Sequence, residues 1–267
     1  MTFQYADITF GADPEVFLFD SSKDKFIASC GRIGGTKKNP IPLPKYEKSS
    51  IQEDNVAVEF NIVPCKSKKE WVNEIASTLA FLRALVSPKD WSIETSSSVL
   101  FSEEELSHPQ AQSFGCEPDY NAWTKEENDF VYLSGEKARL RTAGGHVHVG
   151  YKGATTEQSL LLGRAMDVFL GVPSIILDKD GEERRELYGK AGAIRFKPYG
   201  VEYRTLSNFW LRDTMYTAWV YDQTMKAIRY LNAGGKIDEN DSELVQEVIN
   251  KGKVKEALPL YNKYPII

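Results

Sequence analysis

The chain has 267 residues and a formal net charge of −5 at pH 7. This length suits one large domain that mixes helices and strands, or at most two small ones, and it allows a sizeable buried core. The mild acidity argues against a general polyanion-binding protein, so we expect no duplex nucleic acid as a partner. No apolar run approaches the length that spans a bilayer, and the N-terminal residues lack the features of a signal peptide. We therefore expect a cytoplasmic protein without a membrane partner.

The first half of the chain predicts strands around one long loop. Residues 8–19 predict a strand that is broken near Pro14, because proline cannot donate to a sheet ladder. Residues 25–29 predict its hairpin partner. Residues 31–46 contain three glycines, three prolines and four basic residues, which predict a loop. Residues 56–63 alternate apolar and polar side chains and predict a strand with Glu59 on its polar face.

The chain from residue 67 onward predicts four helices, two further strand segments and one hairpin. Ser67 and Glu70 form a capping box that opens an amphipathic helix reaching about residue 85. The remaining patterned segments are a strand at 91–100, an irregular acidic stretch at 102–128, a short strand within 140–151, a helix at 156–170, a strand–turn–strand unit at 193–208, and helices at 214–231 and 242–258. Strands come first and last with helices between, which favours an α+β fold with a largely antiparallel sheet.

Cysteines and histidines are few in this chain. Cys30, Cys65 and Cys116 are odd in number, widely spaced and without a CxxC pair, so we expect reduced thiols in a cytoplasm rather than disulfides or a zinc ribbon. Two of the three histidines, His146 and His148, lie in the string GGHVHVG. The alternation places both imidazoles on one side of a strand, where they are either a metal site or ordinary surface histidines.

Four strand-like segments carry polar residues two positions apart, which places both members of each pair on one face of a sheet. The pairs are Asp13/Glu15, Glu59/Asn61, His146/His148 and Glu202/Arg204. A carboxylate on a sheet face is costly unless it is solvated, paired or bound to a cation. The four pairs therefore predict a shared polar basin.

A cation-rich stretch precedes the last of these pairs. It contains Arg184, Arg185, Lys190, Arg195 and Lys197, interrupted by glycines. Most charge runs are solvated faces, but guanidinium groups beside a carboxylate-bound metal also suit a transferring phosphoryl group. Oxygen-rich ligands favour Mg²⁺ or Mn²⁺ over zinc, and the combination fits the formation of an acyl phosphate from ATP.

These strings, in this order, resemble the glutamine synthetase-like carboxylate–amine ligases, and most closely the phage amidoligases called COOH–NH2 ligase type 2. The resembling segments are residues 11–17, 56–61, 144–150 and 187–204. The resemblance implies a single ligase domain over residues 1–267. It also implies a curved, largely antiparallel sheet that forms a funnel-shaped active site, with helices on its outer face.

The resemblance assigns roles to individual residues. The implied metal ligands are Asp13, Glu15, Glu59, Glu202 and a histidine, for which His148 is our choice and His146 the alternative. Larger relatives supply a second glutamate near Glu59, and Glu53 or Asp54 could take that place. Arg195, Glu202 and Arg204 are the implied catalytic residues. The residues expected at ATP or phosphate are Arg185, Lys190, Arg195, Lys197 and Arg204.

The leading hypothesis is an ATP-dependent ligase that uses Mg²⁺ or Mn²⁺ and joins a small-molecule or peptide carboxylate to an amine through an acyl phosphate, releasing ADP and phosphate. The loop at 31–46, with Lys37 and Lys38, could close over the site. Two alternatives are a zinc hydrolase that uses His146 and His148, and a non-catalytic phage protein that retains the ligase fold. The resemblance also implies a possible homo-oligomer and, for a phage-encoded chain, the host cytoplasm.

Overall fold

The computed structural model of the protein describes residues 4–44, 46–112, 119–129 and 134–264. The strands are β1 (Thr9–Ala12), β2 (Glu15–Asp20), β3 (Lys25–Ile27), β4 (Ile41–Leu43), β5 (Tyr46–Asp54), β6 (Ala57–Asn61), β7 (Trp91–Glu94), β8 (Ser98–Leu100), β9 (Tyr120–Asn121), β10 (Leu140–Thr142), β11 (Val147–Gly150), β12 (Ala193–Lys197) and β13 (Gly200–Tyr203). The helices are α1 (Lys68–Val86), α2 (Pro109–Gln112), α3 (Thr156–Met166), α4 (Val172–Leu177), α5 (Glu182–Leu187), α6 (Thr214–Asn232), α7 (Ser242–Asn250) and α8 (Val254–Asn262).

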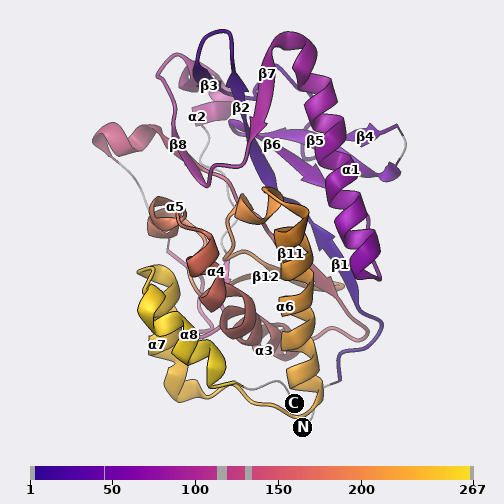
Figure 1. Cartoon of the computed structure of the whole chain (residues 1–267), viewed down its shortest axis with the longest axis vertical. Helices are drawn as coiled ribbons and strands as arrows, with labels where there is room; N and C mark the ends of the chain where they lie inside the picture. Colours follow the sequence, from indigo (N-terminus) through magenta and orange to yellow (C-terminus); the bar gives the residue numbers. More distant parts are fainter. Residues whose placement is uncertain (1–3, 45, 113–118, 130–133, 265–267) are drawn as a thin grey trace.

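Two antiparallel sheets meet along the first strand segment. β1 is the edge of a sheet in the order β1-β11-β13-β12-β9, and β2 belongs to a sheet in the order β3-β2-β6-β5-β4, to which β7 adds. Only Asp13 and Pro14 separate β1 from β2. The end of β6 continues beside β1, because the amides of Phe60 and Ile62 donate to the carbonyls of Pro14 and Ala12. The sheets thus form one curled antiparallel surface (Figure 1).

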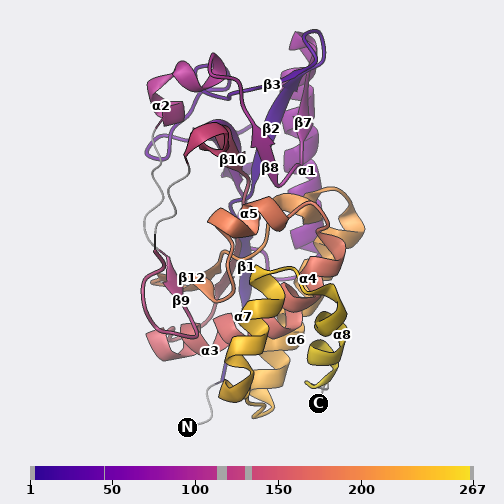
Figure 2. The same ribbon diagram turned by 90° about the vertical axis from the view of Figure 1, so that its left-hand side faces the viewer.

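Alternation decides which face of the sheet each strand buries. In β11, Val147 and Val149 enter the hydrophobic core, so His146 and His148 project from the opposite face. In β6, Val58 and Phe60 are buried, and Glu59 points the other way. α3 packs on β12 and β13, whereas α1 packs on β7 (Figures 1 and 2). α1 and α3 therefore lie on the apolar side of the curled sheet, away from its polar face.

The central helical segment corrects one expectation. α3, a π-helical turn at Asp167–Gly171 and α4 run together over Thr156–Leu177, which is long and apolar enough to cross a membrane by length and composition. The expectation that no segment approaches this length was therefore wrong. Because 72% of the apolar window is buried inside the protein, the segment has the burial expected of a core helix.

Several expected segments differ in detail. The loop at 31–46 contains β4, which pairs with β5, a strand that the pattern did not predict. The expected strand at 91–100 is two strands, since β7 pairs with β2 and β8 with β10. The expected helix at 242–258 is α7 and α8, separated at Gly252, whose φ of +61° suits glycine.

Four further predictions agree with the structure. The α+β class, the antiparallel sheet, the capped helix at α1 and the β12–β13 hairpin are confirmed. Cys30 and Cys65 are buried free thiols, as expected, and Cys116 lies outside the described residues.

Candidate active site

Opposed positions on four neighbouring strands form one row, and polar side chains occupy three of them. In the sheet register, Gly11 of β1 lies opposite His148 of β11, His148 lies opposite Glu202 of β13, and Glu202 lies opposite Arg195 of β12. Directly opposed residues of an antiparallel pair share one face of the sheet. The absence of a side chain at Gly11 leaves this end of the row open, since a Cβ there would lie 3.4 Å from His148 Cβ.

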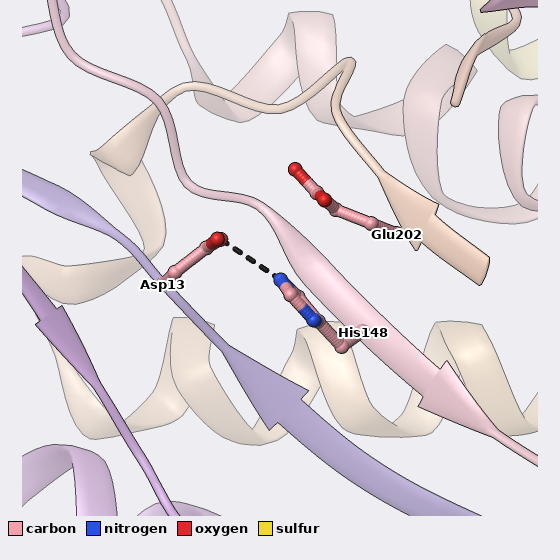
Figure 3. Close-up of side chains that lie close together, drawn as sticks. All are labelled: Asp13, His148 and Glu202. Carbon is pink, nitrogen blue, oxygen red and sulfur yellow. Dashed lines mark ion pairs between the residues drawn. The ribbon is translucent and has the colours of Figure 1, made fainter. Parts of the chain in front are cut away.

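Asp13, His148 and Glu202 form a group that we call the Asp13 cluster. Their ligand atoms lie within 4.8 Å of one another, and Figure 3 shows the Asp13 carboxylate facing the His148 ring beside Glu202. His148 Nε2 lies 3.0 Å from Asp13 Oδ1. Asp13 Oδ1, His148 Nε2 and Glu202 Oε2 are buried, and their close polar neighbours are ionisable side chains. The first two atoms face each other, and Glu202 Oε2 lies 2.7 Å from Lys197 Nζ. Such atoms are suitable ligands for a divalent cation.

His146, the residue immediately before β11, also contacts the Asp13 carboxylate. Its Nδ1 lies 3.3 Å from Asp13 Oδ1, 3.7 Å from Glu202 Oε1 and 3.4 Å from an Arg204 nitrogen. Burial and Arg204 lower the pKa of His146. Burial alone would lower the pKa of His148 as well, but Asp13 raises it. The prediction that both imidazoles lie on one side is confirmed, and of the two, His148 lies closer to Asp13 Oδ1, at 3.0 Å against 3.3 Å.

Three positively charged side chains surround the Glu202 carboxylate. Its side chain is fully buried, and its oxygens lie 2.7 Å from Lys197 Nζ and 3.6 Å from Arg195 Nη1, while Arg204 Nη1 contacts Oε1 directly. Burial and Asp13 act to raise the pKa of Glu202, but Arg204 and the two histidines lower it to about 2. The carboxylate is therefore charged at neutral pH, and three predicted phosphate-binding cations surround it.

A second carboxylate group, the Glu15 cluster, consists of Glu15, Asp54 and Glu59. Their oxygens also lie within 4.8 Å of one another, because Glu15 and Glu59 are opposed in the β2–β6 register. Burial and the Asp54 carboxylate raise the pKa of Glu15 to about 8. Burial, followed by Asp13, Asp54 and Glu15, raises the pKa of Glu59 well above its usual value. A bound cation would relieve this mutual repulsion.

The structure distinguishes the two candidates near Glu59. The Glu53 carboxylate accepts hydrogen bonds from the backbone amides of residues 31–34 at 2.7–3.0 Å, so it organises that loop. Asp54, at the end of β5, instead faces Glu15 and Glu59. The sequence signal for Asp54 is its place before Asn55, which adopts a left-handed φ of +55° and turns the chain into β6.

A cavity of about 290 Å³ adjoins the Glu15 cluster. Its wall includes Glu15 and Asp54, together with His146 and Arg204 from between the two clusters. Further lining side chains are charged, polar or apolar, and they include Lys37, Arg141, Arg184, Gln110, Thr142 and Leu140. The cavity is large enough for a small polar molecule next to the carboxylates.

Two basic residues that were expected at phosphate, Arg185 and Lys190, have contacts outside the two clusters. Arg185 lies 3.6 Å from Asp178 Oδ2 and is not part of the cavity wall, whereas its neighbour Arg184 lines the wall and donates to the carbonyls of Thr205 and Arg204. The sequence pattern did not predict α5, and the position of Arg184 on this helix places it in the cavity wall. Lys190 contributes its carbonyl, which accepts a hydrogen bond from the Thr205 hydroxyl, and its role at phosphate stays a prediction.

The ligand sets of both clusters suit hard divalent cations. The Asp13 cluster offers two carboxylates and one imidazole, and the Glu15 cluster offers three carboxylates. Oxygen-rich sets of this kind favour Mg²⁺ or Mn²⁺, and adjacent paired sites are typical of enzymes that act on phosphate groups.

The sequence pattern of the family described as Phage phiEco32-like COOH.NH2 ligase-type 2 matches residues 123–258, just over half of the chain. The chain belongs to this family, whose name denotes carboxylate–amine ligases. The matched region contains His146, His148, Arg195, Glu202 and Arg204, while the Glu15 cluster lies before it. A comparison with curated proteins finds no match.

Proposed function

We propose that this protein is an ATP-dependent carboxylate–amine ligase with a glutamine synthetase-like catalytic domain. The observation that carries the proposal is the pairing of two carboxylate clusters with Lys197, Arg195 and Arg204 on the polar face of a curled antiparallel sheet. Carboxylates for cations beside guanidinium groups for phosphate are the parts that phosphoryl transfer requires. The family assignment supports the ligase class.

In the proposed reaction, an oxygen of the substrate carboxylate attacks the γ-phosphorus of ATP, and ADP leaves with the electrons of the broken P–O bond. The nitrogen of the amine then attacks the acyl carbon of the acyl phosphate. Phosphate leaves, the nitrogen loses a proton, and an amide remains. ATP therefore supplies the driving force for a bond that would not form readily in water.

The side chains divide this work between them. The Asp13 cluster and the Glu15 cluster would each hold one divalent cation, which when bound neutralises charge on the ATP phosphates and orients them. Arg195 and Arg204, both directed at Glu202, would stabilise negative charge on the transferring group. Lys197 would add a further positive charge beside them.

The cavity beside the Glu15 cluster is the proposed site for the acid substrate. Its volume of about 290 Å³ is at the small end of ligand sites, so we propose a small acid or the end group of a larger one. Thr36 and Lys37 of the 31–46 region line the cavity, which supports a role for this region in excluding water from the acyl phosphate. A phage origin, which the family name supports, would place the reaction in the cytoplasm of an infected host.

ADP release against pooled acids and amines, with and without Mg²⁺, tests the proposal. We expect ADP only when acid and Mg²⁺ are both present, with an increase on adding amine, and a loss of at least about 100-fold in Glu202→Gln. Stoichiometric tight zinc without ATP binding would instead support a hydrolase that uses His146 and His148. Full biological function in Glu59→Ala and Glu202→Ala would support a non-catalytic protein.

A further inference from the structure

Tyr199 contacts the Asp13 cluster from outside the sheet. It lies in the turn between β12 and β13, and its side chain is 46% exposed. Its hydroxyl lies 2.6 Å from His148 Nδ1, and its ring is nearly parallel to the imidazole, at 17° with centroids 6.1 Å apart. The Tyr199 carbonyl accepts a hydrogen bond from the Tyr151 amide, which fixes the turn against the end of β11.

The two ring nitrogens of His148 consequently have different partners. Nδ1 faces the Tyr199 hydroxyl, and Nε2 faces Asp13 Oδ1 at 3.0 Å. A histidine that binds a metal through one nitrogen usually donates the proton on the other nitrogen to a neighbouring oxygen, which sets the tautomer and the ring orientation. A half-exposed tyrosine hydroxyl could bond to water at little cost, so its direction toward Nδ1 calls for a role.

We infer that Tyr199 is the positioning residue of the Asp13 cluster, with its hydroxyl accepting the Nδ1 proton of His148 so that the Nε2 lone pair faces a divalent cation held between Asp13 and Glu202. The inference rests on the proposed function, because it requires a cation in that cluster.

Mn²⁺ binding to the whole chain, measured by calorimetry and electron paramagnetic resonance, tests the role of Tyr199. Tyr199→Phe keeps the ring beside His148 and removes only the hydroxyl. We expect wild type to bind two Mn²⁺ ions, and the dissociation constant of one to rise about 10- to 100-fold in Tyr199→Phe, with the other unchanged. Raising Mn²⁺ by the same factor should fill the weakened site again.

Two further variants make the result specific. Tyr230→Phe is the matched control, because it also removes a hydroxyl that is hydrogen-bonded, to the Lys236 carbonyl, but on α6. Asp54→Asn should weaken the Glu15 cluster, so in that background Tyr199→Phe should affect the single remaining tight site.

Unchanged Mn²⁺ affinities in Tyr199→Phe, with wild type binding two ions, would overturn the role of Tyr199 and leave the proposed function standing. No Mn²⁺ binding by wild type would overturn both.

Discussion

Glu202 shows how neighbouring cations can stabilise a buried charge. Arg195, Lys197 and Arg204 surround its carboxylate, and it is fully removed from solvent. Burying one charge without partners would cost several kcal/mol, so each of these groups depends on the others. The arrangement that suits phosphate chemistry is therefore also part of the folded structure.

Replacing Glu202 by glutamine tests this dependence. Glu202→Gln leaves three cations facing a neutral amide, and we expect the free energy of unfolding to fall by about 3 kcal/mol in urea titrations without metal. The control is Glu239→Gln, which removes the ion-pair partner of Arg164 at a position that is 80% exposed, and should cost less than about 1 kcal/mol. Equal losses in the two variants would contradict the buried-charge account.

Neighbouring residues Glu53 and Asp54 should have separable roles. Asp54→Asn removes one carboxylate from the Glu15 cluster, so we expect the loss of one tight Mn²⁺ site and at least a tenfold fall in ligase turnover. Glu53→Gln weakens the hydrogen bonds to the amides of residues 31–34, so both Mn²⁺ sites should remain while proteolysis of that loop becomes faster. Interchanged outcomes would show that the two assignments are wrong.

Asp167 should control part of the pH dependence of stability. Burial raises the pKa of its carboxyl to about 7, against the hydrogen bonds from Trp123, Tyr203 and Gly192. The unfolded carboxyl loses its proton near pH 4, so this group destabilises the fold progressively as pH rises from about 4 to 7, by up to about 1.4 kcal/mol per pH unit.

Asp167→Asn should remove that contribution, because an amide does not titrate and the Tyr203 hydroxyl can accept from it. Urea unfolding of both proteins at several pH values between 4.5 and 7.5 measures the difference. We expect the stability of wild type to fall relative to the variant as pH rises across this range. Parallel curves would contradict the raised pKa.

At the scale of elements, the segment before β11 is closely packed against the 3₁₀ turn at Asn208–Leu211. The Gly145 amide donates to the Leu206 carbonyl, and Trp210 Nε1 donates to the Gly145 carbonyl. A Cβ at Gly145 would lie 2.2 Å from the Ser207 carbonyl oxygen and 2.4 Å from Trp210 Nε1. This contact sets the start of the strand that carries both histidines.

Gly145→Ala should therefore destabilise the protein by about 2–3 kcal/mol through overpacking, measured by urea unfolding. Gly153→Ala is the control, because a Cβ there meets nothing within 4 Å and only its φ of +69° adds strain, at about 1 kcal/mol. A loss at Gly145 no larger than the loss at Gly153 would show that the packing contact is unimportant.

The alternation of apolar and polar residues predicted from which side of each strand the site residues project. It did not predict which strands pair with one another. Residues two apart, such as His146 and His148, share a face in any strand, so their common direction was evident from the sequence. The row from Gly11 through His148 and Glu202 to Arg195 depends on register, which long-range pairing determines. The same limit left Glu53 and Asp54 undecided.

Among the elements that the sequence did not predict, β5 and α5 were missed for physical reasons. β5 has few apolar residues and no regular alternation, so its sequence does not indicate a strand. Its pairing with β4 and β6 stabilises the strand conformation. α5 is short and rich in charged residues, so its sequence EERREL resembles a solvated loop. The different surroundings of Arg184 and Arg185 depend on this helix. The sequence prediction therefore placed Arg185 at phosphate, whereas the structure places Arg184 in the cavity wall.

At the scale of the whole molecule, one hydrophobic core joins both sheets. It includes Tyr5 near the N-terminus, Val58 of β6, Val149 of β11 and Tyr264 after α8. The two carboxylate clusters lie on different sheets, with Asp13 and Glu15 on either side of the junction at Pro14. This common core supports the proposal of a single catalytic domain, because both clusters need one rigid support to stay in register.

Trapping of the acyl phosphate with hydroxylamine tests the central claim most directly. Hydroxylamine replaces the unknown amine, so only a suitable acid, ATP and Mg²⁺ need to be supplied. We expect hydroxamate and ADP to form in equal amounts, and both to be lost in Glu202→Gln. ADP without hydroxamate, or hydroxamate without consumption of ATP, would contradict ligation through an acyl phosphate.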